Sequence, residues 1–370
     1  MISTRHYGAV DLTEGRDLQK PEILKWLRTE DARELEELWQ AADAVRKQSV
    51  GDAVHLRGLL EISNHCIRRC GYCGLNAGNR ELTRYRMSRE EILACVATAV
   101  EYGYGTVVMQ AGEDYGIATD WLAGIVRQIK QETGLAVTLS MGERPIDDLT
   151  VWRQAGADRY LLRFETTSPS LYERVHPADE RQRPGRIDLL KILRELGYEI
   201  GSGVMIGIPG QSLSSLADDI LLFRALDLDM IGVGPFIPHP QTMLGSSNSP
   251  VAPDADQVPN TEMMVYKVIA LARLVCPQAN IPSTTALATI NTETGRENGL
   301  SRGANVVMPN LTPTKYRALY EIYPGKACIN ETAVQCRYCL EGRIESIRRR
   351  VGHGPGSRAG RVKERIVDGS

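Results

Sequence analysis

The stretch Glu61-Ile-Ser-Asn-His-Cys-Ile-Arg-Arg-Cys-Gly-Tyr-Cys-Gly74 places Cys66, Cys70 and Cys73 in a C-x3-C-x2-C spacing directly after a short apolar run. Three thiolates this close in sequence can bind three irons of a 4Fe–4S cluster, which leaves the fourth iron open to another ligand. A structural zinc site normally has four protein ligands. No fourth Cys or His stands at a finger-like spacing here, and His65 is too close to Cys66. The spacing therefore predicts an iron–sulfur cluster; a loop that binds zinc or no metal is the alternative.

Composition limits the class of protein. The chain has 370 residues, a net charge of −2 and a pI near 6.4, so nucleic acid and anionic membranes are not expected as main partners. No apolar run is long enough to span a membrane, and residues 1–7 contain no apolar core of a secretory signal. In such a chain, tightly spaced cysteines indicate metal binding rather than disulfides. We expect a cytoplasmic, oxygen-sensitive protein.

Short apolar or β-branched runs alternate with helical patterns along most of the chain. The expected strands are 58–63, 105–110, 135–140, 159–164, 200–206, 229–234, 281–285 and 304–308. The expected helices between them are 88–102, 120–132, 146–155, 186–196, 212–226, 261–275 and 293–301. This alternation predicts an α/β protein with a (β/α)8 TIM barrel, and helices at 21–28 and 31–47 that pack on its outside. A doubly wound sheet is the alternative, but no Gly-rich fingerprint follows the first strand.

Polar residues follow most of the expected strands, at the end where a β/α barrel builds its active site. Besides the cysteine loop, these segments are 110–114, 138–143, 207–211, 235–239, 284–285 and 308–310. A barrel shaped only by packing would not have polar residues at nearly every rim position, so we expect one active site at this mouth. The long connection 235–259 is either a lid over the site or a surface insertion.

The fourth expected strand has an unusual charge pattern. With a period of two, Arg159, Leu161, Arg163 and Glu165 share one face of the strand. Both faces of a barrel strand are covered, so these charges are expected to be buried and to need partners. One interpretation is a structural Arg–Glu pair at the barrel rim. The other is a binding site in which Arg holds a carboxylate and Glu165 accepts hydrogen bonds from ribose hydroxyls.

A second cysteine group stands near the C-terminus. Cys328, Cys336 and Cys339 have a C-x7-C-x2-C spacing. They are candidates for an auxiliary 2Fe–2S or 4Fe–4S cluster, or for zinc with His353 as the fourth ligand. The chain beyond Arg343 is rich in Arg, Gly, Pro and Ser, which is typical of a solvated or disordered end.

Over nearly its whole length the sequence resembles the HydE family, the radical S-adenosylmethionine (SAM) maturases of FeFe hydrogenases. The cysteine spacing with Tyr72 before the last cysteine is similar to the whole radical SAM superfamily, and later stretches are more specific. These are Arg84-Tyr-Arg-Met87, Gln110-Ala-Gly-Glu-Asp114, Val137-Thr-Leu-Ser140, Gly156-Ala-Asp-Arg-Tyr-Leu-Leu-Arg163 with Glu165-Thr166, Gly207-Ile-Pro-Gly-Gln211, Gly234-Pro-Phe-Ile-Pro-His-Pro240, Ile281-Pro-Ser-Thr-Thr-Ala286, and Met308-Pro-Asn310 through Tyr323-Pro-Gly-Lys326. The resemblance implies an N-terminal helical segment (1–50), a radical SAM barrel (51–325) and a C-terminal extension (326–370) with the auxiliary cluster motif.

The resemblance also implies site residues. Cys66, Cys70 and Cys73 would hold the catalytic 4Fe–4S cluster, whose open iron chelates SAM and whose electron cleaves it to a 5′-deoxyadenosyl radical. The implied SAM contacts are Tyr72, Ala111, Gly112, Glu113, Ser140, Glu165 and Arg186. The implied lining of the substrate cavity is Gln110, Thr138, Arg159, Arg163, Met230, Thr284, Thr285, Tyr320 and Tyr323. Leu311 departs from the pattern, since we expect Trp there in some relatives.

The implied substrate is a small-molecule iron complex, a cysteine-bound iron carbonyl–cyanide unit, on the way to the dithiomethylamine-bridged di-iron subcluster of the hydrogenase H-cluster. The implied partners are two other hydrogenase maturases, a tyrosine-cleaving radical SAM enzyme and a GTPase scaffold. The closest alternative is a methylornithine synthase-type mutase that acts on an amino acid. Biotin synthase fits less well, because no cysteines stand on the mid-barrel strands. A carrier of iron–sulfur clusters that no longer cleaves SAM is the alternative outside enzymes.

Overall fold

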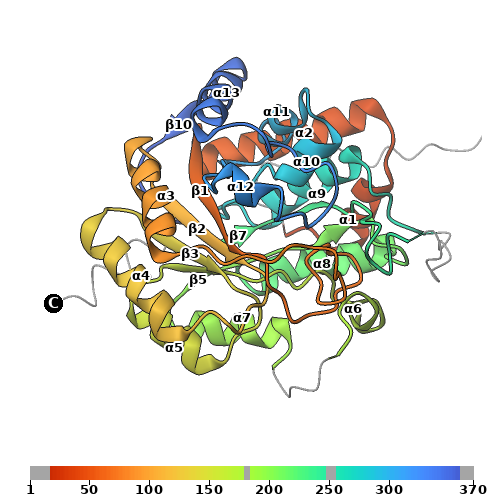
Figure 1. Ribbon diagram of the computed structural model, residues 1–370. Helices are drawn as coiled ribbons and strands as arrows, with labels where there is room; N and C mark the ends of the chain where they lie inside the picture. Colours follow the sequence, from red (N-terminus) through yellow and green to blue (C-terminus); the bar gives the residue numbers. More distant parts are fainter. Residues whose placement is uncertain (1–16, 179–183, 247–255, 359–370) are drawn as a thin grey trace, which may run out of the picture.

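The computed structural model describes residues 17–178, 184–246 and 256–358, in which parallel strands form the centre and helices surround them (Figure 1). The strands are β1 (Ala53–Ser63), β2 (Thr106–Ala111), β3 (Ala136–Ser140), β4 (Arg159–Leu161), β5 (Glu199–Ser202), β6 (Met205–Ile206), β7 (Met230–Ile231), β8 (Gly234–Pro235), β9 (Val306–Val307) and β10 (Arg350–Gly352). The helices are α1 (Lys20–Arg28), α2 (Ala32–Val50), α3 (Arg89–Glu101), α4 (Thr119–Glu132), α5 (Ile146–Gln154), α6 (Pro169–Val175), α7 (Arg186–Glu195), α8 (Leu213–Ala225), α9 (Glu262–Val275), α10 (Thr285–Ile290), α11 (Gly295–Ser301), α12 (Thr314–Arg317) and α13 (Ala333–Ser346).

The pairings run around a closed ring, which confirms the predicted barrel. Strands β1, β2, β3, β4, β5 and β7 pair in this order, all in parallel, and β9 pairs with β1. Two isolated parallel bridges, Met230 to Asn280 and Pro282 to Val306, join β7 to β9. The strand predicted at 281–285 is therefore reduced to single bridges. Pro282 has no N–H to donate, which prevents a continuous ladder at this position.

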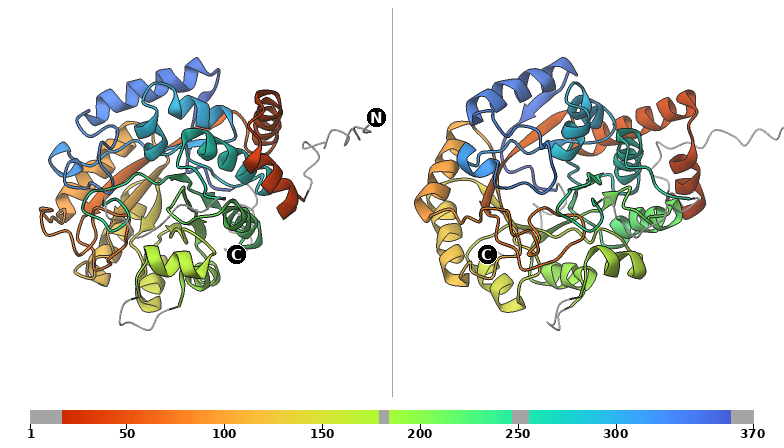
Figure 2. Two further views of the ribbon diagram at one scale, coloured as in Figure 1. Left: turned by 90° about the vertical axis from the view of Figure 1, so that its right-hand side faces the viewer. Right: turned by 45° about the vertical axis from the view of Figure 1, so that its right-hand side comes forward.

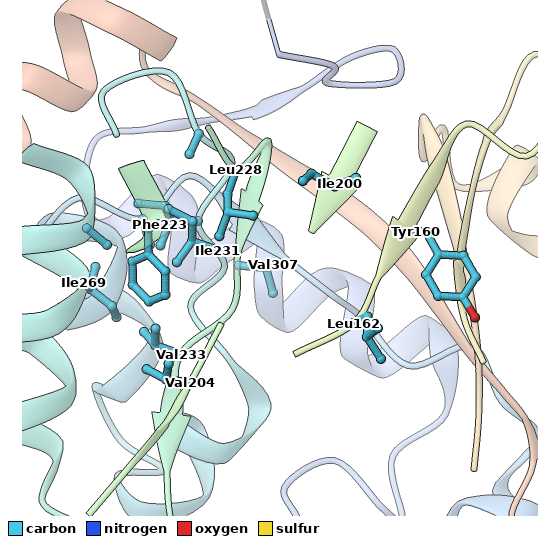
Figure 3. Packing of buried hydrophobic residues seen from close by; sticks show 14 of the residues in the cluster. Tyr160, Leu162, Ile200, Val204, Phe223, Leu228, Ile231, Val233, Ile269 and Val307 are labelled. Carbon is cyan, nitrogen blue, oxygen red and sulfur yellow. The ribbon is translucent and has the colours of Figure 1, made fainter. Parts of the chain in front are cut away.

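The outer helices explain the two helical segments predicted at the N-terminus. Helix α2 buries Leu35, Leu38, Trp39, Ala42 and Val45 on one face and packs against α9, while α1 packs against α8 and α9. Helix α9 is consequently buried nearly all round. Between helices and strands lies the hydrophobic core, in which Phe223 from α8 lies beside Ile231 and Val233 (Figure 3). Among the helices that the structure describes, none combines the length and apolar character that a membrane crossing requires.

The C-terminal segment is ordered where its composition predicted a solvated or disordered end. Strand β10 pairs in parallel with the start of β1, and Figures 1 and 2 show this blue segment beside the orange β1. Beyond it, the Pro355 carbonyl accepts from Thr106 Oγ1 (3.0 Å) and the Gly356 carbonyl accepts from Arg57 Nη2 (3.1 Å) and Asn280 Nδ2 (3.0 Å). The prediction was wrong for residues up to 358, because backbone carbonyls, which composition does not reveal, bind the amino end of the barrel. Residues 359–370 lie outside the described part.

Asp219 on α8 fixes the turn that follows β4. Its Oδ1 accepts hydrogen bonds from Thr167 N (2.5 Å) and Thr167 Oγ1 (2.7 Å), and its side chain is fully buried. Burial raises the pKa of Asp219 to about 7. Between about pH 4 and this value the folded chain holds a proton that the unfolded chain has released, so stability falls as the pH rises through that window.

We therefore expect Asp219→Asn to flatten the pH dependence of the free energy of unfolding between about pH 4 and 7. Denaturant unfolding at several pH values measures this slope. Asp218→Asn is the matched control, because the neighbouring Asp218 carboxylate is 47 % exposed and pairs with Lys20. If the stability of the Asp219→Asn variant still falls as steeply with pH, the dependence belongs to other groups.

Candidate active site

The three cysteines of the first motif lie on the loop between β1 and α3, at the carboxyl end of the barrel. Backbone hydrogen bonds tie this loop to distant parts of the chain. The Gly71 N–H donates to the Val175 carbonyl (2.9 Å), and the Gly74 N–H donates to the Ile322 carbonyl (3.0 Å). The Leu244 N–H donates to the Gly71 carbonyl (2.9 Å), so the described start of the 235–259 connection packs on the cysteine loop.

Arg84 holds the same loop from within. Its guanidinium group donates to the backbone carbonyls of Asn64, Leu75, Asn76 and Asn79 at 2.6 to 3.2 Å. The planar fork of an arginine suits this arrangement better than a lysine ammonium would. Sequence reasoning assigned Arg84 no role, since its spacing does not distinguish a ligand of backbone carbonyls from a surface charge.

A cavity of about 340 Å³ lies beneath the loop, and Cys66, Cys70 and Cys73 all line it. Among the residues predicted to contact SAM, the lining contains Tyr72, Ala111, Glu113, Ser140, Glu165 and Arg186. Among those predicted to contact substrate, it contains Gln110, Arg163, Met230, Thr284, Thr285 and Tyr323. The barrel thus brings residues from distant strand ends to one cavity beside the cysteines.

The surroundings of the three cysteines favour the thiol over the thiolate. Cys70 is buried, and Cys66 and Cys73 are half-buried. Burial raises the pKa of all three thiols, that of Cys73 to about 12. Because iron binds thiolates, loading of a cluster here must release these protons.

Two guanidinium groups flank one carboxylate at the wall next to the cysteines. Arg186 Nε donates to Glu143 Oε1 at 2.7 Å, and Arg68 Nη1 lies 3.7 Å from Glu143 Oε2. Both arginines line the cavity. Glu113 lines the cavity as well and its charge also acts on Arg68, so this wall combines two guanidinium groups with two carboxylates.

Glu165 occupies a strained position just after β4. Its φ of 65° lies in the left-handed region, which costs a non-glycine residue about 1 to 3 kcal/mol and often marks a functional site. Glu165 Oε1 accepts from the Tyr72 hydroxyl (3.3 Å), and Oε2 accepts from Arg163 Nη2 (2.8 Å). The Arg163 side chain is 32 % exposed, so the prediction that it is buried is wrong: it faces the open cavity.

Arg159 lies at the opposite end of the barrel, outside the cavity lining. It is fully buried and donates from Nε to Glu199 Oε2 at 2.6 Å. Its other nitrogens donate to Thr106 Oγ1 (3.1 Å), the Pro355 carbonyl (3.0 Å) and Ser357 Oγ (2.7 Å). The prediction that Arg159 lines the substrate cavity is therefore wrong. The strand period put Arg159 and Arg163 on one face but could not tell how far along the barrel each lies.

Three further predicted residues are also outside the lining. Thr138 is buried in the middle of β3, and Tyr320 is buried with its hydroxyl accepting from Gln110 Nε2 (3.2 Å). Gly112 faces the cysteine loop instead of the cavity. A Cβ atom at Gly112 would collide with the His65 carbonyl and lie 2.8 Å from Cys66 Cβ, so the close approach of β2 to the loop requires glycine.

An ion pair that the sequence did not suggest completes the cavity. Lys326 Nζ pairs with Glu61 Oε1, both side chains are almost fully buried, and both line the cavity. Asn310 Nδ2 donates to Glu61 Oε2 at 3.0 Å, and Lys326 Nζ lies 5.2 Å from the centre of the Tyr320 ring. These residues are far apart in sequence, so only the fold reveals the pair.

In the C-terminal cysteine group, Cys336 lies close to both Cys328 and Cys339. Cys336 and Cys339 are one turn apart on α13, and the Cys336 thiol hydrogen-bonds to Cys328. This bond, together with the charge of Arg296, lowers the pKa of Cys328 to about 6. Within residues 17–178, 184–246 and 256–358, no three His, Cys, Asp or Glu side chains are placed to hold one metal ion. The structure thus does not assemble a zinc site from these cysteines and His353.

Comparisons with known proteins agree with this geometry. Residues 60–223 match the Radical SAM superfamily. The chain is 43 % identical to the [FeFe] hydrogenase maturase subunit HydE of Thermotoga maritima, over 93 % of this chain and 95 % of that protein. It is 30 % identical to 3-methylornithine synthase of Methanosarcina acetivorans, over 80 % of each chain.

Among solved structures, the fold is similar to methylornithine synthase PylB, with a TM-score of 0.76, 23 % identity and coverage of 96 % of this chain and 98 % of that one. The match to the radical SAM superfamily implies a 4Fe–4S cluster and SAM as cofactors. The chain is a radical SAM enzyme and belongs to the family of the [FeFe] hydrogenase maturase subunit HydE.

Proposed function

We propose that this enzyme takes part in FeFe-hydrogenase maturation by acting on a cysteine-bound iron carbonyl–cyanide complex. The observation that carries the proposal is one cavity that the three cysteines line together with charged residues of both signs, in a chain 43 % identical to HydE. The other maturases, a tyrosine-cleaving radical SAM enzyme and a GTPase scaffold, would supply the substrate and receive the product.

The residues present fit a 4Fe–4S cluster. Cys66, Cys70 and Cys73 line the cavity, yet within the described residues no three such side chains converge on one ion. In a cluster each cysteine binds a different iron, so the three sulfurs need not meet at one point, as they would around zinc. When bound, the cluster and SAM would supply a 5′-deoxyadenosyl radical inside the cavity.

The chain's own residues would hold and orient SAM. Glu165 has a positive φ and lines the cavity. Its carboxylate can accept hydrogen bonds from ribose hydroxyls. Arg186 offers a buried positive charge to the SAM carboxylate. Tyr72, Glu113 and Ser140 complete this side of the cavity, and Gly112 lets the Ala111–Glu113 turn reach the cysteine loop.

The other side of the cavity would hold the anionic iron complex. Arg163 and Lys326 place positive charge there, each beside a carboxylate, Glu165 and Glu61 respectively. The same space is lined by Gln110, Met230, Thr284, Thr285 and Tyr323. Cys328, Cys336 and Cys339 would bind an auxiliary 2Fe–2S or 4Fe–4S cluster at the edge of the barrel.

A substrate-dependent assay tests the proposal. Purified anaerobically with iron, sulfide, SAM and reductant, the enzyme is expected to form 5′-deoxyadenosine faster with the cysteine-bound iron complex than without it. A mutase of the methylornithine synthase type would act on an amino acid, and lysine serves as the matched alternative substrate in the assay. Stimulation by lysine and not by the iron complex would assign the enzyme to the mutases, and no SAM cleavage at all would leave a cluster carrier.

A further inference from the structure

His176 lies between a cysteine of the cluster motif and the candidate SAM site. Its Nδ1 is 3.2 Å from Cys70 Sγ, and its Nε2 is 2.9 Å from the Tyr72 hydroxyl oxygen. The Tyr72 hydroxyl is in turn 3.3 Å from Glu165 Oε1. Four side chains thus form one continuous hydrogen-bonded chain, from a sulfur that would bind iron to a carboxylate that would bind SAM.

The protein holds the imidazole ring in a fixed orientation. His176 is 2 % exposed and directly follows α6. Its backbone N–H donates to the Tyr172 backbone carbonyl at 2.7 Å. The Tyr172 ring stacks on it, with ring centres 5.0 Å apart and an interplanar angle of 24°. The neighbouring Val175 carbonyl accepts from Gly71 N, so α6 and the cysteine loop are tied together next to the ring.

A neutral imidazole carries one N–H, so His176 can donate to Cys70 or to Tyr72, but not to both. With Cys70 as a thiol, S–H donates to Nδ1, Nε2–H donates to Tyr72, and the Tyr72 hydroxyl donates to Glu165. A thiolate has no proton to give and accepts instead. The Cys70–His176 and His176–Tyr72 hydrogen bonds must then point the other way, and the Tyr72 hydroxyl no longer donates to Glu165.

We propose that His176 is a positioning residue that donates Nδ1–H to the Cys70 sulfur in the loaded enzyme and accepts the Tyr72 hydroxyl proton at Nε2. A sulfur bound to iron can only accept a hydrogen bond, so Nδ1 is the donating nitrogen and Nε2 the accepting one. The Tyr72 hydroxyl then points to Nε2. Glu165 Oε1 is thereby released from Tyr72 and is free to accept from SAM. The inference rests on the cluster proposed at Cys66, Cys70 and Cys73.

Two consequences can be measured separately. A hydrogen bond to a cluster sulfur stabilises the reduced, more negative state and so raises the reduction potential. Loss of one hydrogen bond to a charged group is expected to lower the ratio of reduced to oxidised cluster about tenfold at a fixed potential. For a one-electron couple, this corresponds to a shift of the reduction potential by about 59 mV to more negative values. Loss of the contact between His176 and Tyr72 instead lets the Tyr72 hydroxyl donate to Glu165 again, which weakens SAM binding.

Two isosteric variants separate these effects. The amide nitrogen of Asn lies near the position of Nδ1 and can donate to Cys70, whereas the amide oxygen of Gln can lie near Nε2 and accept from Tyr72. His176→Asn is expected to keep the potential of the loaded cluster but to bind SAM more weakly. His176→Gln is expected to shift the potential to more negative values. EPR-monitored redox titration of the reconstituted full-length chain gives the potential, and equilibrium dialysis with SAM gives the affinity.

Electron–nuclear double resonance on the wild-type enzyme adds a test that does not depend on a variant's folding. An exchangeable proton coupled to the reduced cluster, lost in His176→Gln and retained in His176→Asn, is the expected result. Equal potentials in both variants and the wild type, or a wild-type cluster with no exchangeable proton beside it, would overturn the assignment of His176. A wild-type chain that binds no cluster would instead overturn the proposed function.

Discussion

Replacing Cys70 with alanine is expected to abolish the iron–sulfur cluster and, with it, all cleavage of SAM. Among the described residues, only three cysteines line the cavity, so loss of one leaves two thiolates for a cluster that needs three. The fold should survive, because Gly71, Gly74 and Arg84 hold the loop through backbone hydrogen bonds that do not involve the thiol.

Absorbance near 400 nm, iron content and 5′-deoxyadenosine formation measure this effect under anaerobic conditions. Cys95→Ala is the matched control: Cys95 is a buried cysteine in α3 and lies outside the cavity lining, so its removal should leave all three readings unchanged. A brown Cys70→Ala enzyme that still turns over SAM would refute the assignment of the cluster to this loop.

Arg159→Leu and Arg163→Leu are expected to fail in different ways, although both residues stand near β4. Arg159 is fully buried against Glu199, and its removal leaves a buried carboxylate without its partner. Breaking such a pair typically costs about 3 to 5 kcal/mol of folding free energy. Arg163 is partly exposed to the cavity, so its removal should cost little stability but weaken binding of the anionic iron complex.

Denaturant unfolding of both variants, together with separate binding measurements for SAM and the iron complex, distinguishes these outcomes. Arg163→Leu should lose more affinity for the iron complex than for SAM. Equal losses for both ligands would place Arg163 in the SAM site, through its hydrogen bond to Glu165. A stable Arg159→Leu chain would show that the Glu199 carboxylate finds another partner or a proton.

The sequence predicted the barrel well because strand and helix periods repeat along the chain. The rule that active-site residues stand at the carboxyl ends of barrel strands pointed to the segments that contain Glu113 and Ser140, and both residues line the cavity. What the sequence could not reveal depends on distance along the barrel axis. The predicted strand 159–164 put Arg159 and Arg163 on one face, yet β4 ends at Leu161, Arg159 lies at the amino end of the barrel, and Arg163 lines the cavity.

Residues that act through partners far away in sequence were also beyond prediction. Lys326 pairs with Glu61, and His176 meets Cys70, across separations of 265 and 106 residues. The prediction of a solvated or disordered C-terminal end was wrong for a related reason. The backbone carbonyls of Pro355 and Gly356 accept hydrogen bonds at the amino end of the barrel. Every residue has such a carbonyl, so the composition of the segment could not predict these bonds.

The most direct test of the account is activation of apo-hydrogenase by the other maturases, anaerobically with SAM and reductant, with and without this protein. Activation is predicted to depend on the wild-type chain and to be absent with Cys70→Ala. Equal activation without the protein, while SAM is still cleaved, would contradict its role in hydrogenase maturation and direct the search for its substrate to amino acids.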